Sequence, residues 1–136
     1  MKVSPHLNFN GQCETAFKFY EKCLGGKITF MLTYGDSSVA AQTRPGWHKK
    51  IIHATFTVGD QTFSGADVGE RYQKPQGISL TLEVADPAEA DRIFKSLAEN
   101  GSVQMPIQET FWAWRFAMFT DQFGTPWMIN CGKPRV

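Results

Sequence analysis

Residues 108–131 read QETFWAWRFAMFTDQFGTPWMINC, a stretch rich in aromatic residues. It contains all but one of the four tryptophans of the chain, together with several phenylalanines. Such a density of aromatic residues, interrupted at residues 121–124, predicts two antiparallel strands joined by a tight turn in which Gly124 takes a positive φ. A hairpin this apolar needs cover on one face, so we expect the upstream chain to pack against it.

The polar residues of this stretch must reach solvent or converge on a ligand. Glu109 lies close to Trp112, and a carboxylate in apolar surroundings is expected to have a raised pKa suited to proton transfer. An ion pair between Glu109 and Arg115 is the structural alternative. Trp112 and Trp127 suit stacking on a planar ligand, but large aromatic residues also belong in cores and dimer interfaces. The hairpin is therefore predicted to form one wall of a ligand cavity.

The composition limits the kinds of protein that this chain can be. The chain has 136 residues, 42% hydrophobic content and a net charge of +1, which favours one folded domain and disfavours nucleic-acid binding and charge-driven membrane binding. No apolar run approaches the roughly 20 residues of a membrane span, and the N-terminus lacks the features of a signal peptide. We therefore expect a cytoplasmic protein. Its three cysteines form no CxxC pair and suit reduced, buried thiols.

The predicted elements occur twice in the same order. Each half begins with a strand and an amphipathic helix, and the second helix opens with the capping-box sequence of residues 86–89. A shift of 75 positions places Leu7 on Leu82, Glu14 on Glu89 and Gly26 on Gly101. The sequence thus predicts an α+β fold of two βαβββ modules, residues 1–70 and 77–136, within a single domain of residues 1–136. The predicted strands are residues 3–9, 27–34, 51–58, 61–66 and 77–85, then two further strands and the final hairpin strand; the first helix is residues 12–24.

Side-chain alternation indicates which polar residues share a face. Leu7 is expected to lie beneath the first helix, so His6 points the other way, and the alternation in residues 51–58 gives His53 and Thr55 the same direction. His53 is a candidate acid-base group or ligand contact, with a hydrogen-bonded strand histidine as the alternative. Asp67 ends a strand, where a turn-capping role competes with a catalytic one.

Three segments carry a resemblance to a known family: FNGQCETAFKFYEKCLGG at 9–26, HATFTVGDQTFSGAD at 53–67, and QETFWAWRFAMFTDQFGTPWMIN at 108–130. They resemble the PhnB-like family of the vicinal oxygen chelate superfamily, which includes glyoxalases, bleomycin-resistance proteins and dioxygenases. The resemblance implies a glyoxalase-like half-barrel fold, a homodimer and a small-molecule ligand. Family labels also mention a demethylubiquinone methyltransferase, yet the chain lacks a glycine-rich strand-to-helix turn that would cradle a nucleoside cofactor.

The resemblance also implies a divalent metal held by His, Gln or Glu from the first, fourth, fifth and eighth strands. The first strand offers His6, or Pro5 if the register shifts by one residue, but the other strands offer poor donors. We therefore predict no metal site and no cofactor, with a bound divalent metal as the disfavoured alternative. The other candidate positions are Ser64 or Asp67 in the fourth strand, Ser79 or Thr81 in the fifth, and Met128 and Asn130 in the eighth.

These observations favour a small-molecule-binding protein whose ligand is not specified by the sequence. The alternative is an enzyme of glyoxalase, lyase or dioxygenase type acting on a small oxygenated metabolite, with His53, Asp67 and Glu109 as acid-base or metal groups. The predicted ligand contacts are His6, Thr55, Trp112, Trp127 and Arg115.

Overall fold

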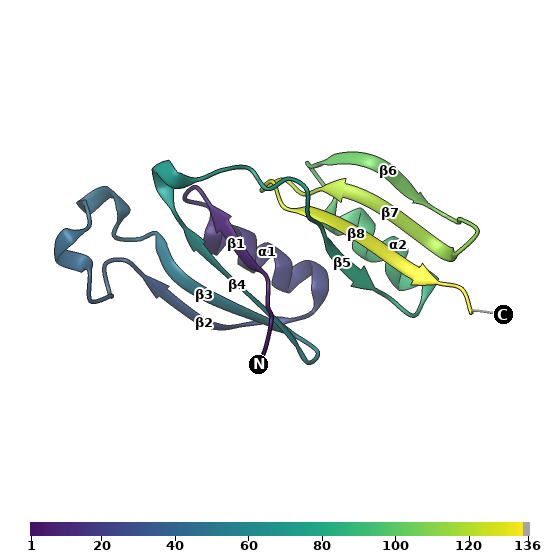
Figure 1. The fold of residues 1–136 in the computed structure, drawn as a ribbon, viewed down its shortest axis with the longest axis horizontal. Helices are drawn as coiled ribbons and strands as arrows, with labels where there is room; N and C mark the ends of the chain where they lie inside the picture. The colour runs from purple at the N-terminus through teal and green to yellow at the C-terminus, as the bar shows by residue number, and fades with distance from the viewer. Residues whose placement is uncertain (135–136) are drawn as a thin grey trace. The chain divides into compact units, whose positions relative to one another are not determined.

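The computed structural model describes residues 1–134. These residues form two compact units, Met1–Gln73 and Lys74–Val136, the second described as far as residue 134. Each unit is a βαβββ module in which a four-stranded sheet carries one α-helix on one face (Figure 1). The predicted α+β class and the predicted duplication are therefore confirmed.

Unit 1 has the strand order β1-β4-β3-β2, in which β1 pairs in parallel with β4 and the other pairs are antiparallel. The long loop between β2 and β3 contains two short 3-10 turns, and a third follows β4. The elements of unit 1 are β1 (His6–Phe9), α1 (Cys13–Leu24), β2 (Lys27–Thr33), β3 (Ile51–Val58) and β4 (Gln61–Asp67), with 3-10 turns at Ala40–Gln42, Pro45–Trp47 and Gly69–Arg71.

Unit 2 repeats this order as β5-β8-β7-β6, again with its first and last strands parallel. Its first strand is shorter than the predicted 77–85, because only four residues pair with β8. The predicted hairpin is formed by the last two strands, with Gly124 at φ 92° in the turn. The elements are β5 (Leu80–Glu83), α2 (Pro87–Leu97), β6 (Ser102–Gln108), β7 (Ala113–Thr120) and β8 (Pro126–Gly132).

The ends of the helices follow their sequences. Gly25 ends α1 in the left-handed conformation at φ 75° and donates its N–H to the Glu21 carbonyl, as glycine commonly does after a helix. Asp86 caps α2 by accepting a hydrogen bond from the Ala88 N–H at 3.1 Å, and Pro87 occupies the first helical turn. Both predicted helix boundaries are thereby confirmed to within a residue.

Steric crowding explains why glycine occurs at the equivalent positions 26 and 101 of the two modules. A Cβ atom on Gly26 would lie 2.6 Å from the carbonyl oxygen of Thr57, and one on Gly101 would collide with the carbonyl oxygen of Thr120. Both contacts are with the strand that pairs with the strand following the glycine. Each module thus needs a residue without a side chain where the chain leaves the helix and enters the sheet.

The core of unit 1 is a cluster of aromatic rings between α1 and its sheet. Phe17 of α1 lies edge-on to Phe9, Phe56 and Phe63, with ring centroids 5.6 to 6.1 Å apart, a separation typical of favourable aromatic pairs. Gly65 lets this ring approach, since a Cβ there would lie 2.8 Å from Phe17. The core therefore fixes which face of the sheet α1 covers.

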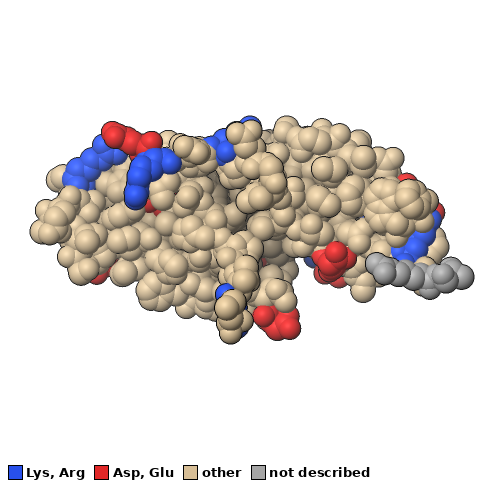
Figure 2. Space-filling model, viewed as in Figure 1, with Lys and Arg blue, Asp and Glu red and all other residues tan. Residues whose placement is uncertain are grey.

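The state of the cysteines and the distribution of surface charge agree with what the composition predicts. Cys13, Cys23 and Cys131 are buried and free, as predicted. No helix within residues 1–134 is long and apolar enough to cross a membrane. On the face shown in Figure 2, Lys and Arg atoms occur in separate groups, some beside acidic atoms, rather than as one continuous basic patch.

Candidate functional site

The face of the unit 1 sheet opposite α1 carries a row of side chains in register across all four strands. His6 in β1 pairs with Ser64 in β4, Ser64 with Thr55 in β3, and Thr55 with Phe30 in β2. His53 lies two residues from Thr55 on the same face. We call these five residues the imidazole face.

Contacts within the imidazole face hold the rings together. His6 Nδ1 is hydrogen-bonded to Ser64 Oγ at 2.6 Å, and the rings of His6 and His53 are stacked with centroids 6.1 Å apart. The Phe30 ring lies 6.0 Å from His53, and Thr55 Oγ1 is 3.5 Å from His53 Nε2. The structure thus brings together three predicted ligand-site residues and Ser64, the candidate position in the fourth strand, and adds Phe30.

The pKa of His6 is lower than that of an ordinary histidine. Partial burial of the ring is the larger cause and the neighbouring His53 the next, while a hydrogen bond with Asn8 acts in the opposite direction. Burial and a nearby positive group both disfavour the protonated form. His6 is therefore neutral at pH 7 and presents an imidazole that both donates and accepts hydrogen bonds.

Asp67 is a structural residue in this fold. Its side chain is fully buried, and Oδ1 accepts hydrogen bonds from the backbone N–H groups of Gly11 and Cys13 at 2.8 and 3.0 Å. Its Oδ2 accepts the N–H of Ile51 at 2.8 Å. Asp67 therefore joins the start of α1 to β3 and β4, which fits the capping alternative and leaves no carboxylate oxygen directed at a ligand.

The corresponding face of unit 2 has a different character. Thr81, Met128, Met118 and Met105 follow one another in register across its four strands, and we call the three thioethers the methionine row. Beside it, Asn130 donates its amide to Glu83 at 3.1 Å. The Asn130 Oδ1 atom is buried and has no hydrogen-bond partner among residues 1–134. This face therefore offers soft, apolar contacts beside the polar Asn130–Glu83 pair.

The prediction of a raised pKa for Glu109 is wrong. Glu109 is exposed in the connection between β6 and β7, and its pKa is lowered, chiefly by a 2.6 Å hydrogen bond from Lys133. In place of the structural alternative, an ion pair with Arg115, Glu109 pairs with Lys133. Arg115 pairs with Asp91 of α2 at 2.9 Å, because strand alternation places it on the same helix-covered face as Ala117.

The effect of Lys133 on Glu109 can be measured directly. Replacing Lys133 with glutamine is expected to raise the pKa of Glu109 toward its ordinary value, since the positive partner that stabilises the carboxylate is lost. Carboxyl carbon shifts of Glu109 followed by NMR across acidic pH provide the measurement. Lys95→Gln on α2 is the control and should leave the titration unchanged. An unaltered Glu109 titration in Lys133→Gln would contradict this assignment.

The predicted ligand contact at Trp127 also needs correction. Trp127 pairs with Phe119 and alternates with the half-buried Met128, so it lies on the helix-covered face and is only 2% exposed. Its indole N–H donates to Asp121 Oδ2 at 2.8 Å. Trp112, in contrast, is 42% exposed and packs edge-on against Phe116, with centroids 5.2 Å apart. Trp112 therefore remains an accessible aromatic residue, and Trp127 belongs to the core.

The donor set does not fit the divalent metal that the superfamily resemblance implies. Among residues 1–134, no three His, Cys, Asp or Glu side chains are grouped so that they could hold a metal ion. His6 is hydrogen-bonded to Ser64, and the eighth strand presents Met128 and Asn130 beside hydroxyl-bearing Thr81. Hydroxyl and thioether groups are weak ligands for hard divalent ions.

The fold defines the class of protein. The chain is similar to a glyoxylase/bleomycin resistance protein/dioxygenase domain from Frankia sp. EAN1pec, with a TM-score of 0.67 over 98% of each chain at 14% identity. It therefore has the fold of the vicinal oxygen chelate superfamily. The family model described as 3-demethylubiquinone-9 3-methyltransferase matches residues 1–130. The chain belongs to that family, which is the PhnB-like family.

Three relatives are similar along nearly their whole length. The crystal structure of PA1353 from Pseudomonas aeruginosa is 43% identical with a TM-score of 0.87, and the match covers 98% of this chain and 99% of that one. A PhnB protein from Bacillus cereus is 27% identical with a TM-score of 0.81, covering 96% and 98%. Protein YjdN of Escherichia coli (strain K12) is 33% identical over 147 residues, covering 98% and 97%.

Proposed function

We propose that this chain is a small-molecule-binding protein that takes an oxygenated ligand on the imidazole face. The observation that carries the proposal is the cluster of two imidazoles and two hydroxyls on the sheet face that α1 does not cover, in which His6, Ser64 and Thr55 are in register. His6 and Ser64, on neighbouring strands, thus present donors and acceptors close together. Converging polar groups beside an apolar wall are what small-molecule sites require.

The chemistry of the face selects the ligand class. His6 is neutral at pH 7 because its pKa is lowered, and the His53 ring lies beside it on the same face. Phe30 is 49% exposed and lies against His53, so it supplies an aromatic surface. Neighbouring hydroxyl or carbonyl oxygens on a small planar molecule would match these groups without any charge.

Catechol is a suitable probe, since it carries two adjacent hydroxyls on a flat ring. Catechol is expected to shift the imidazole nitrogen signals of His6 and His53 in NMR spectra and to bind measurably by calorimetry. His6→Gln and His53→Gln should each weaken binding about tenfold, the loss expected for one or two hydrogen bonds. His48→Gln, in the loop before β3, is the matched control.

Two outcomes would overturn the proposal. One is an unchanged catechol affinity in both His6→Gln and His53→Gln. The other is the absence of any imidazole shift with catechol and with hydroxyacetone, a non-aromatic molecule with adjacent oxygens. Phe30→Ala separates the two probes, because it should weaken catechol binding and leave hydroxyacetone binding unchanged.

The enzyme alternative has less support from the geometry. Of its three acid-base candidates, Asp67 has its carboxylate oxygens engaged by backbone N–H groups, and the pKa of Glu109 is lowered by Lys133. Only His53 stands where a ligand would meet it. We also propose that ligand binding needs no metal and no organic cofactor; stoichiometric Zn, Ni or Fe by elemental analysis, lost in His6→Gln, would contradict this.

We further propose that the protein is a cytoplasmic homodimer. The free buried thiols suit a reducing compartment. Phe111 is 90% exposed, and Trp112 and Trp114 are each 42% exposed, which is more aromatic surface than a small monomer usually presents. Sheet edges at β2 and β6 also have no strand partner on one side within residues 1–134.

Sedimentation tests the dimer. At micromolar concentration we expect twice the 15.3 kDa mass of one chain, because burying the exposed rings favours association. Phe111→Ser together with Trp112→Ser is expected to shift the equilibrium toward the monomer. Val3→Ser, at another exposed apolar side chain, is the control. A single species of 15.3 kDa in the unchanged protein would rule the dimer out.

A further inference from the structure

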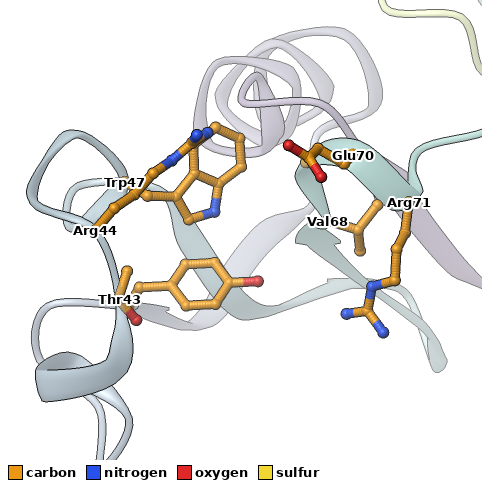
Figure 3. A pocket seen from close by; sticks show the side chains of 8 residues that line it. Thr43, Arg44, Trp47, Val68, Glu70 and Arg71 are labelled. Carbon is orange, nitrogen blue, oxygen red and sulfur yellow. The ribbon is translucent and has the colours of Figure 1, made fainter.

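Unit 1 contains a cavity, broadly open to solvent, that shares no residue with the imidazole face. Its volume is about 340 Å³, and it lies between the loop that follows β2 and the 3-10 turn that follows β4 (Figure 3). A cavity of this size is within the usual range for small-molecule sites. The side chains that matter for its chemistry are Tyr34, Arg44, Trp47, Glu70 and Arg71.

The two aromatic walls are fixed in place. Tyr34 donates its hydroxyl to the backbone carbonyl of Asp67 at 2.6 Å, and its ring centroid lies 6.5 Å from that of Trp47. Gly69 adopts φ 62°, and a Cβ there would lie 3.5 Å from Trp47. The loop itself is held by the hydrogen bond between His48 Nε2 and the Thr43 carbonyl at 2.8 Å. The cavity is therefore largely preformed, which lowers the entropic cost of binding.

The cavity has an excess of positive charge. Arg44 lies over the Trp47 ring at 5.0 Å, and Arg71 lines the opposite side together with Glu70. Within residues 1–134, neither arginine has a carboxylate within ion-pair distance. Two guanidinium groups thus face a cavity that contains one carboxylate. Each guanidinium retains donors that suit a carboxylate ligand.

We propose that this cavity binds a planar aromatic carboxylate. The ring of the ligand would lie against Trp47 and Tyr34, and its carboxylate would accept hydrogen bonds from Arg44 or Arg71. The aromatic walls provide stacking surface and the unpaired arginines provide the counter-charge, so both parts of the ligand have a matching group. The site goes beyond the proposed function, because the imidazole face suits uncharged oxygenated molecules.

Three probes separate the contributions of ring and charge. Calorimetry is expected to detect binding of 2-naphthoate. 2-Naphthamide, which has the same ring without the charge, should bind at least about tenfold more weakly, as expected from losing a charged hydrogen bond. Acetate, which has the charge without the ring, should show no binding at millimolar concentration. Equal affinities for naphthoate and naphthamide would overturn the inference.

Variants locate the binding. Arg44→Gln and Arg71→Gln are expected to weaken naphthoate binding, each by about fivefold to tenfold, and Glu70→Gln is expected to strengthen it by removing a like charge. Arg92→Gln, at an exposed arginine of α2, is the matched control and should have no effect. His53→Gln should also have no effect, which separates this site from the imidazole face.

Two results would overturn the assignment. One is a naphthoate affinity that is unchanged in both Arg44→Gln and Arg71→Gln. The other is competition between naphthoate and dimer formation. In that case the naphthoate affinity would decrease as the protein concentration rises, and added naphthoate would lower the sedimenting mass. The cavity would then hold part of a second copy of the chain. Indole N–H signals supply a direct readout, because Trp47 should shift with naphthoate and Trp127 should not.

Discussion

Asp67→Ala is expected to lower the free energy of unfolding by about 4 kcal/mol, because it leaves buried backbone donors without their acceptor. The carboxylate accepts the N–H groups of Gly11, Cys13 and Ile51 at 2.8 to 3.0 Å. Each buried donor left unpaired costs about 1 to 3 kcal/mol, and the costs are not fully additive. These donors belong to the turn before α1, to α1 itself and to β3, so the loss would loosen several elements of unit 1 at once.

Urea denaturation followed by far-ultraviolet circular dichroism measures the effect. Asp67→Asn keeps one carbonyl oxygen but places an amide N–H₂ where Oδ2 or Oδ1 accepted, so we expect an intermediate loss of about 2 kcal/mol. Asp60→Ala, in the exposed turn between β3 and β4, is the matched control and should change stability by less than about 0.5 kcal/mol. A similar stability for Asp67→Ala and Asp60→Ala would show that Asp67 does not join these elements.

Trp127→Ala is expected to cost about 4 kcal/mol, through loss of burial and the cavity left behind. The indole is 2% exposed and donates to Asp121 Oδ2, while Asp121 Oδ1 accepts the N–H groups of Phe123 and Thr125 at 2.8 and 3.1 Å. Trp127 thus packs the core of unit 2 and supports the turn of its final hairpin. Trp127→Phe retains most of the volume, and we expect it to lose about 1 to 2 kcal/mol.

Trp114→Ala is the matched control for Trp127→Ala, because Trp114 is 42% exposed on the same hairpin. Its ring contacts Lys133 through a cation–π interaction at 4.8 Å, which is worth about 0.5 to 1 kcal/mol at an exposed site. Midpoints of urea unfolding should therefore separate the two variants clearly. Equal midpoints would mean that Trp127 is not a core residue.

The fold was predictable because its determinants are local and repeated. Gly26 and Gly101 end helix-to-strand turns at the same place in each module, and the structure shows the same close approach to a strand carbonyl at both. Helical spacing and strand alternation located the elements between them. The prediction of β5 was too long, because the apolar Ile78 and Val84 extended the alternating pattern, whereas within residues 1–134 the pairing with β8 runs only from Leu80 to Glu83.

The candidate site was only partly predictable. Strand parity correctly placed His6, His53 and Thr55 on one face, because alternation within a strand is a local property. Glu109 and Arg115 were misjudged because their partners, Lys133 and Asp91, lie 24 residues away in the sequence. No local pattern specifies such a partner. The register pairing of Phe30 with Thr55 could be found only once the β2–β3 bulge was known.

The methionine row gives unit 2 a sensitivity that unit 1 does not share. Met105, Met118 and Met128 are adjacent in register and partly exposed, so an oxidant that reaches one sulfur can reach its neighbours. Conversion to sulfoxide would replace soft apolar groups with polar, chiral ones on the same surface. Oxidative stress would therefore alter the methionine row of unit 2 more than the imidazole face of unit 1. Reductases that act on methionine sulfoxide would restore the methionine row.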